Sequence, residues 1–239
     1  MTKAQHDSEG ETSVDDTATR RTVRSFVLRG RTTEAQEKAL QDSWSTVGLT
    51  PKAGEWLHNL VPGDCPPIME IGIGNGDALI AMAQMDQTTP FVGVEVHRPG
   101  VGAALIEIQR RNLSNVQLIC QDACELLENN VAEASLGGVR LYFPDPWHKT
   151  RHHKRRIVQP DFVRQIARAM KPQSLFHLAT DWQPYADHMV SVLEASSQFI
   201  NVAGPGQPSP RPDWRIETRF ERRGLRLGHE VTDLIYQRC

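Results

Sequence analysis

The chain has 239 residues, of which 39% are hydrophobic, with four cysteines and a formal net charge of −2. This length allows one α/β domain with a sizeable core. The absence of an apolar run of ~20 residues argues against a membrane span and a secretory signal. The absence of a CxxC pair argues against a cysteine metal site. We therefore expect a cytoplasmic protein with reduced thiols.

The N-terminal part of the chain is predicted to be disordered at first and then helical. Residues 1–19 are polar and acidic with almost no large apolar side chains, so burial cannot offset the entropy of ordering them, and we expect a disordered leader. A basic and helical extension follows over residues 20–60, in which Thr33 is placed to cap a helix over residues 33–44. Residues 20–239 are expected to form a single domain.

Short apolar runs alternate with helical stretches after a loop rich in proline and glycine, and this order is typical of a parallel sheet wrapped by helices. Residues 217–223 and 230–238 have the pattern of an antiparallel hairpin, and residues 203–212, with four prolines, should form an exposed connector. We expect an α/β, Rossmann-like fold with a mostly parallel seven-stranded sheet and a C-terminal antiparallel hairpin. The other strands are expected at residues 68–73, 91–96, 116–120, 139–143 and 175–179, with helices at 77–85, 101–112, 124–130 and 161–171.

The first of these strands ends in a carboxylate and leads into a turn with three glycines, namely Glu70, Gly72, Gly74 and Gly76. Glycines at every second position let the backbone pass close to a ligand. A carboxylate before the turn would repel a pyrophosphate and attract an ammonium or sulfonium group, and the last glycine of a dinucleotide fingerprint is missing, so the pattern favours S-adenosylmethionine. The same glycines could also form an ordinary tight turn between a strand and a helix.

Further carboxylates follow the next two strands. Glu95 ends the second strand, where it could accept hydrogen bonds from both ribose hydroxyls of an adenosine, and Asp122 follows the third strand. Ligands of open parallel sheets bind beyond the carboxyl ends of the strands, so acids at three consecutive strand ends should converge on one crevice. Asp122 has an alternative role as the N-cap of the helix that follows it.

The fourth strand leads into an acid held between two prolines and then into a basic run. Pro144 and Pro146 restrict the backbone around Asp145, which indicates a pre-organised carboxylate in the crevice. Residues 149–156 carry five cations and no acid, a composition suited to phosphates, although such a run can also be a solvated face. Residues 20–31, 149–156 and 211–226 together hold 16 of the 27 Lys and Arg but only three of the 29 acids, so the chain is an acidic body with three basic segments.

These motifs resemble those of the bacterial tRNA (guanine-N7)-methyltransferase family. The resemblance is carried by residues 70–76, 93–97, 143–156, 179–182 and 218–224 and extends over about residues 20–238; the Phe-Pro-Asp-Pro-Trp sequence before the basic run is highly specific. It implies a Rossmann-like methyltransferase fold, S-adenosyl-L-methionine as methyl donor with S-adenosyl-L-homocysteine as product, and methylation at N7 of guanine 46 in the variable loop of tRNA. It implies no metal, no membrane and no obligatory protein partner.

The resemblance also assigns roles to individual residues. Asp145 is the catalytic candidate. The candidates for cofactor binding are Glu70, Gly72, Gly74, Gly76, Glu95, Asp122 and Asp145. The candidates for contact with the tRNA are Lys149, Arg151, His152, His153, Lys154, Arg155, Arg156, Asp181, Thr218, Arg219, Phe220 and Glu221.

The implied reaction needs little acid–base chemistry. Guanine N7 is an acceptor without a hydrogen, so its attack on a sulfonium methyl group requires no proton removal, and the catalyst mainly aligns and stabilises. Asp145, helped by Asp181, would hold the N–H edge of the guanine or stabilise the positive charge on the purine; a general-base role is less compelling. Trp147 or Trp182 could stack on the base or belong to the core. The histidines are too irregularly spaced to predict a metal site.

Two other classes of function are open to the same residues. A nicotinamide-dependent oxidoreductase is compatible with the glycine turn and Glu95, but Glu70 and the missing glycine disfavour it. A non-catalytic RNA-binding module would keep the basic segments around an empty pocket. Loss of tRNA binding by an Asp145→Ala variant of a protein without any methylation activity would indicate the module.

Overall fold

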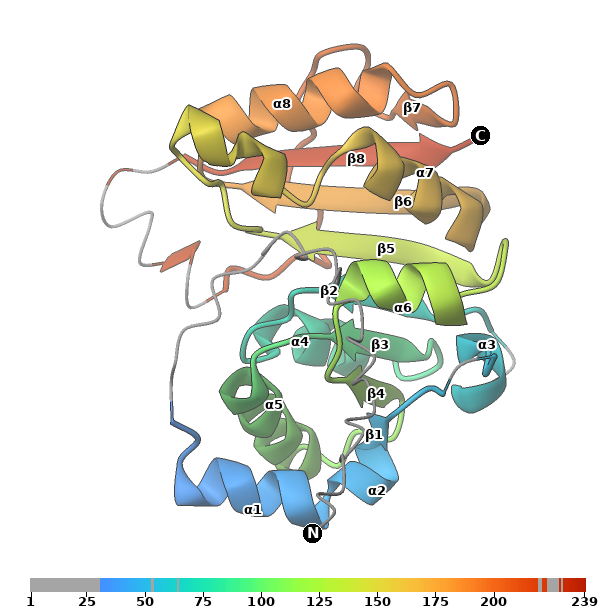
Figure 1. Ribbon diagram of the computed structural model, residues 1–239, viewed down its shortest axis with the longest axis vertical. Helices are drawn as coiled ribbons and strands as arrows, with labels where there is room; N and C mark the ends of the chain where they lie inside the picture. Colours follow the sequence, from blue (N-terminus) through green and yellow to red (C-terminus); the bar gives the residue numbers. More distant parts are fainter. Residues whose placement is uncertain (1–30, 53, 64, 219–220, 223–227, 229) are drawn as a thin grey trace, which may run out of the picture.

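The computed structural model describes residues 31–239 except 53, 64, 219–220, 223–227 and 229. Its centre is one sheet with the strand order β1-β4-β3-β2-β5-β6-β8-β7 (Figure 1). Strands β1 to β6 pair in parallel, and β8 is antiparallel to both β6 and β7. The predicted mostly parallel sheet with an antiparallel C-terminal pair is confirmed. The strands are β1 (Gly48–Leu49), β2 (Ile68–Ile71), β3 (Phe91–Val94), β4 (Val116–Ile119), β5 (Leu136–Tyr142), β6 (Met170–Thr180), β7 (Phe199–Asn201) and β8 (Thr232–Arg238).

Two details of the sheet correct the prediction. The described part of the chain forms eight strands, not seven, because the two-residue strand β1 adds to the edge at β4. The antiparallel pair consists of β7 and β8, whereas Glu221 and Arg222, within the predicted strand 217–223, are helical. Glu221 is buried there because its carboxylate pairs with arginines and not because it faces a neighbouring strand. The predicted leader, residues 1–19, and the basic residues 20–30 lie outside the described residues.

Helices cover both faces of the sheet. The first begins at the predicted cap: the Thr33 hydroxyl accepts from the Gln36 N–H, and the Gln36 side chain accepts from the Thr33 N–H. Within the described residues no helix is long and apolar enough to span a bilayer. The helices are α1 (Glu34–Asp42), α2 (Trp44–Val47), α3 (Leu57–Leu60), α4 (Asp77–Met85), α5 (Arg98–Arg110), α6 (Ala123–Asn130), α7 (Pro160–Ala169) and α8 (Gln183–Glu194), with a 3-10 helix at Thr150–Arg155.

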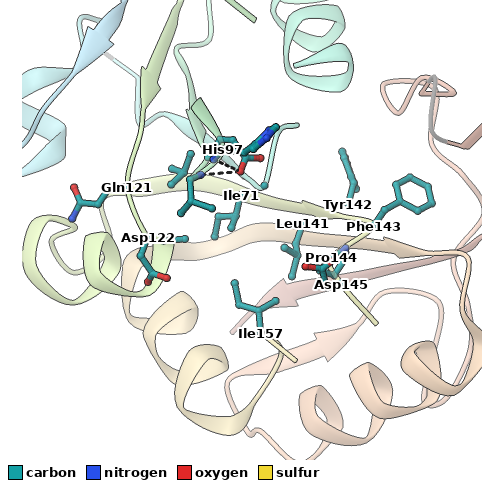
Figure 2. A pocket seen from close by; sticks show the side chains of 15 residues that line it. Ile71, His97, Gln121, Asp122, Leu141, Tyr142, Phe143, Pro144, Asp145 and Ile157 are labelled. Atoms are coloured by element: carbon teal, nitrogen blue, oxygen red, sulfur yellow. Dashed lines mark hydrogen bonds between the residues drawn. The ribbon is translucent and has the colours of Figure 1, made fainter. Parts of the chain in front are cut away.

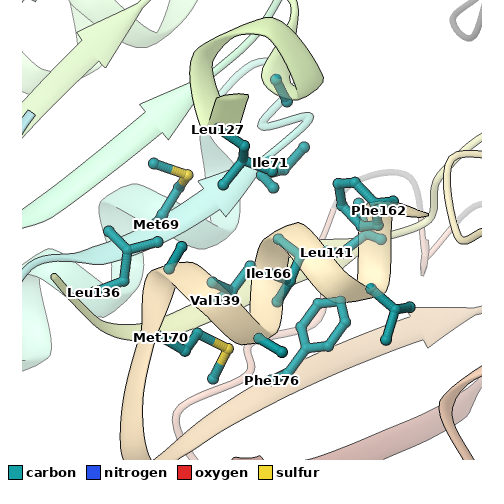
Figure 3. Packing of buried hydrophobic residues seen from close by; sticks show 14 of the residues in the cluster. Met69, Ile71, Leu127, Leu136, Val139, Leu141, Phe162, Ile166, Met170 and Phe176 are labelled. Atoms are coloured by element: carbon teal, nitrogen blue, oxygen red, sulfur yellow. The ribbon is translucent and has the colours of Figure 1, made fainter. Parts of the chain in front are cut away.

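The apolar core has one part on each side of the sheet. On one face, Phe162 and Ile166 of α7 pack onto Val139 and Leu141 of β5 and Phe176 of β6 (Figure 3). On the other face, α4 and α5 pack over β3 and β4, and α1 packs against α5. Because these strands are buried on both faces, each of them is a continuous apolar run in the sequence.

The face that carries α4 and α5 becomes polar beyond β2. There the side chains of Glu70, Arg140, His177 and Asp233 come from β2, β5, β6 and β8, and all four are buried. The segment between β7 and β8 contributes the buried Arg215 to this region. Its first part, residues 203–212, is exposed or half-buried throughout, as predicted for a connector.

Candidate active site

A cleft of about 260 Å³ lies at the carboxyl ends of β2 to β5 (Figure 2). It is where the crevice was predicted, because these strands are parallel neighbours and the chain leaves each of them at the same edge of the sheet. Three of the predicted carboxylates, Glu95, Asp122 and Asp145, line it. The full lining is Ile71, Gly72, Val94, Glu95, Val96, His97, Gln121, Asp122, Ala123, Leu141, Tyr142, Phe143, Pro144, Asp145 and Ile157.

The glycine turn borders this cleft through its first glycine, Gly72. Gly72, Gly74 and Gly76 all have left-handed φ angles, of 75°, 55° and 84°. Gly72 lines the cleft, whereas Gly76 is the cap residue of α4, where a Cβ atom would stand 2.9 Å from the Cβ of Ala104. Glycine is therefore required at this position both for the turn and for the approach of α4 to α5.

Glu95 joins the glycine turn to the start of α5. Its Oε2 accepts from the Gly74 N–H at 2.9 Å. Its Oε1 accepts from the N–H groups of Val96 and His97 at 2.8 and 3.0 Å, which are the dashed bonds in Figure 2. A carboxylate that accepts three backbone hydrogen bonds is fixed in direction. The structure thus gives Glu95 a local structural role in addition to its position in the cleft.

Glu70 is buried and does not belong to the lining of the cleft. Its side chain is 3% exposed, and β2 pairs Glu70 with Arg140 of β5. Burial raises the pKa of this carboxyl from 4.5 to about 8, although the Arg140 charge opposes the shift. Among the described residues, Oε2 of Glu70 has no hydrogen-bond partner. Contact between Glu70 and a cofactor remains a prediction.

Asp122 combines both of the roles considered for it. Its Oδ1 accepts from the N–H groups of Cys124 and Glu125, at 2.9 and 3.1 Å, and so caps α6. The residue also lines the cleft, and Figure 2 shows it on the opposite side from Asp145. The helix cap therefore orients a carboxylate that borders the cleft.

Asp145 lies in a bent loop that is anchored at its start. Phe143 and Trp147 both have left-handed backbones, with φ of 49° and 44°, a conformation that costs a residue other than glycine about 1–2 kcal/mol. The Phe143 N–H donates to the carbonyl of Ala179 at 2.8 Å, which ties the loop to β6. Backbone strain of this kind is often found where a side chain is held for function.

The basic run forms the 3-10 helix at Thr150–Arg155, and its side chains differ in exposure. Lys149, Arg151 and Lys154 are exposed, and His152, His153 and Arg155 are half-buried. Arg155 lies with its guanidinium carbon 4.9 Å from the ring centre of Trp147, which is itself buried, whereas Trp182 is 37% exposed. Of the two tryptophans, only Trp182 is exposed enough to meet a base.

Arg156 differs from the others in the basic run and corrects the prediction of a phosphate contact. It is 3% exposed, and its Nε donates to the Pro146 carbonyl at 2.9 Å. Its guanidinium carbon lies 4.8 Å from the ring centre of Tyr185, and Nη2 lies 3.0 Å from Nε2 of His153. Its charge therefore fastens the Asp145 loop to α8 and does not face solvent.

Three of the remaining predicted RNA contacts, Asp181, Thr218 and Glu221, lie outside the cleft lining. Asp181 is half-buried just after β6. The Thr218 hydroxyl accepts from the Glu221 N–H at 3.1 Å, and Glu221 is 2% exposed, paired with Arg215 and Arg211. Arg219 and Phe220 lie outside the described residues. Burial of Glu221 corrects the expectation that its carboxylate faces RNA.

Some cleft residues were not predicted. His97, Gln121 and Tyr142 line it, and each stands within three positions of the end of a parallel strand. Counting up to three residues on either side of each strand-end acid would have found them. In the part of the chain that the structure describes, no three His, Cys, Asp or Glu side chains are grouped so as to hold a metal ion.

Comparison with protein families and curated proteins gives consistent matches. A family model described as "Putative methyltransferase" matches residues 64–234. The chain is 50% identical to the tRNA (guanine-N(7)-)-methyltransferase of Alcanivorax borkumensis over 235 residues, which cover 98% of this chain and 97% of that relative. It is 48% identical to the same-named protein of Alkalilimnicola ehrlichii over 232 residues, covering 95% of this chain and 98% of the relative.

Solved structures share the fold at low sequence identity. The 16S rRNA methyltransferase KamB matches with a TM-score of 0.53 at 14% identity, covering 76% of this chain and 90% of that one. The 30S ribosomal A1408 methyltransferase from an uncultured bacterium matches with a TM-score of 0.50 at 12% identity, covering 81% and 98%. At these identities the likeness concerns the fold alone, and the predicted Rossmann-like methyltransferase fold is confirmed.

Proposed function

The chain belongs to the tRNA (guanine-N7)-methyltransferase family, and we propose that it transfers a methyl group from S-adenosyl-L-methionine to N7 of a guanine in tRNA. We place the target at guanine 46 of the variable loop. The observation that carries the proposal is the gathering of Glu95, Asp122 and Asp145 around one cleft beside a run of exposed cations. We also propose that the chain needs no obligatory protein partner.

The residues around the cleft suit S-adenosyl-L-methionine. Carboxylates attract its ammonium and sulfonium groups and can accept hydrogen bonds from its ribose hydroxyls, so Glu95 and Asp122 would hold these parts. Apolar side chains such as Val96, Leu141 and Ile157 would take the uncharged adenine. The same acids disfavour the pyrophosphate of a nicotinamide cofactor. When bound, the cofactor supplies an electrophilic methyl group on a positively charged sulfur.

Asp145 would act on the guanine through electrostatics. Because guanine N7 carries no hydrogen, its methylation would need no proton removal, and a positive charge would develop on the purine. A fixed carboxylate stabilises that charge as it develops, or holds the guanine by its N–H edge. The two left-handed residues that flank Asp145 would keep its direction constant during the transfer.

The exposed cations next to Asp145 would bind the tRNA backbone. Lys149, Arg151 and Lys154 are exposed and lie four to nine residues after Asp145 in the chain. Phosphate contacts fix the orientation of a nucleic acid without reading its sequence. Trp182, whose ring lies 4.4 Å from that of His148, offers an exposed aromatic surface for an unstacked base.

One assay tests the proposal. The purified chain alone is incubated with S-adenosyl-L-methionine and unmodified tRNA, and the nucleosides are identified by mass spectrometry, with fragment mapping of the methylated position. We expect N7-methylguanosine at position 46, and a large loss of product with Asp145→Asn at unchanged tRNA binding. Absence of N7-methylguanosine would overturn the proposal, and activity that appears only after a second protein is added would refute the lack of a partner.

A further inference from the structure

A buried polar network lies beside the cleft, on the sheet face that α4 and α5 leave uncovered. The Tyr142 hydroxyl is 3.0 Å from Nδ1 of His177, and Nε2 of His177 is 2.8 Å from Oδ1 of Asp233. Because Asp233 is an acceptor, Nε2 carries the hydrogen, and Nδ1 accepts from the tyrosine. Tyr142 lines the cleft, so the network begins at the candidate active site.

Arg215 is the centre of this network. It is 3% exposed, and its Nη2 donates to Asp233 at 2.8 Å. Nη1 and Nη2 also donate to the two carboxylate oxygens of Glu221, at 2.7 and 3.0 Å. Its guanidinium carbon stands 5.9 Å from the ring centres of both Tyr142 and Phe143. One side chain from the segment between β7 and β8 therefore contacts two acids and two aromatic rings of the cleft wall.

The two ends of the network lie next to different parts of the candidate site. At one end, Phe143 precedes Asp145 by two residues and lines the cleft. At the other end, Glu221 donates its N–H to the Thr218 hydroxyl, and Thr218 is one of the residues that the family resemblance assigns to RNA contact. Arg215 thus connects the loop that holds the catalytic candidate with the segment expected to meet the substrate.

The network is also balanced in charge, which explains its burial. Arg215 and the more exposed Arg211 face the two carboxylates of Glu221 and Asp233. Burial lowers the pKa of His177, so that the ring between Tyr142 and Asp233 is neutral. A guanidinium can bind two carboxylates at once through its planar set of donors, and the ammonium of lysine cannot reproduce that geometry.

We propose that Arg215 is a positioning residue that holds Thr218 and Glu221 in register with the Asp145 loop, so that the guanine and the methyl donor meet in line. This inference rests on the proposed function. It assigns Glu221 an indirect role, since the Glu221 carboxylate is occupied by arginines inside the protein. Displacements of about 1 Å between reacting groups can lower a rate by about a hundredfold without weakening binding.

The test separates positioning from binding and from folding. Arg215→Lys is compared with wild type for kcat at saturating substrates, for the Kd of tRNA and of S-adenosyl-L-homocysteine, and for Tm. Because the exposed cations and the cleft carboxylates are unchanged, we expect kcat to fall by about tenfold or more while both Kd values change less than about threefold. An unchanged kcat, or a loss explained by weaker tRNA binding alone, would overturn the inference.

A double-variant cycle provides the second measurement. If Glu221 acts through Arg215, Glu221→Gln adds little to the kcat loss of Arg215→Lys, whereas Lys154→Ala, which changes an exposed cation, adds its effect independently. Independent effects of Arg215→Lys and Glu221→Gln would also contradict the inference. If Arg215→Lys does not fold, Asp233→Asn is tested by the same criteria. An inactive wild type would instead refute the proposed function.

Discussion

Replacement of Arg156 by methionine should destabilise the protein while leaving the charge that faces RNA unchanged. Arg156 is the only member of the basic run 149–156 that is buried, and it holds the loop of Asp145 through the Pro146 carbonyl. Methionine preserves much of the side-chain volume over the ring of Tyr185 but removes the charge and the hydrogen bonds.

The expected size of the loss follows from two contacts. A hydrogen bond from a charged donor contributes about 1.5–3 kcal/mol, and a cation over a desolvated aromatic ring contributes about 2 kcal/mol. The variant also avoids the cost of burying a charge, which offsets part of the loss, so we estimate about 3 kcal/mol. For a chain of this length that corresponds to a fall in Tm of about 6–12 °C.

Two assays on matched variants check this reasoning. Thermal unfolding should show the fall in Tm for Arg156→Met and almost none for Lys154→Ala, which replaces an exposed cation. The plot of log Kobs for tRNA against log salt should become shallower by about 0.7–0.9 for Lys154→Ala and keep its slope for Arg156→Met. If Arg156→Met changed the slope and left Tm unaltered, Arg156 would contact phosphate and the structural role would be refuted.

Three further predictions concern the acids around the cleft. Glu95→Gln keeps an acceptor but loses the charge that organises the glycine turn, so calorimetry should give about a tenfold weaker Kd for S-adenosyl-L-homocysteine; an unchanged Kd would count against the role of Glu95. An Asp122→Asn variant should keep the cap of α6 and weaken cofactor binding. An Asp122→Ala variant should weaken cofactor binding and also lose about 1 kcal/mol of stability in denaturant unfolding. Equal stability of the two variants would contradict the capping role of Asp122. For Glu70, the pKa is raised to about 8 in the folded protein, so the folded state binds more protons than the unfolded state between about pH 4.5 and 8. The stability that this group contributes is therefore lost as the pH rises through that range. The Tm of Glu70→Gln relative to that of wild type should increase from pH 5 to pH 8. A difference in Tm that stays constant with pH would show that Glu70 does not titrate in this range.

The parallel part of the fold was predictable because its signals are local. Each buried strand is a short apolar run, and the helix at Asp77–Met85 was predicted with the bounds that the structure has. Helix α8 was missed although Tyr185, Met189 and Leu193 have helical spacing behind Pro184. Strand β7 has only three residues and gains its stability from pairing with β8, which no local pattern reveals.

The strand-end acids were predictable for the same reason, whereas the burial of two arginines was not. Glu95, Asp122 and Asp145 converge because topology brings parallel strand ends together. Arg156 and Arg215 read in the sequence as members of basic segments, yet both are buried by partners that fold next to them. Sequence alone gives the sign of a charge, but the partner that neutralises it is chosen by tertiary contacts.

The central claim is that one cleft at the sheet edge holds the methyl donor beside the acid of the Asp145 loop. A crystal structure with S-adenosyl-L-homocysteine tests it most directly. We predict that the ligand lies between Glu95 and Asp122, with its sulfur directed toward Asp145. A ligand bound elsewhere on the protein, with the cleft of Asp145 left empty, would contradict the claim.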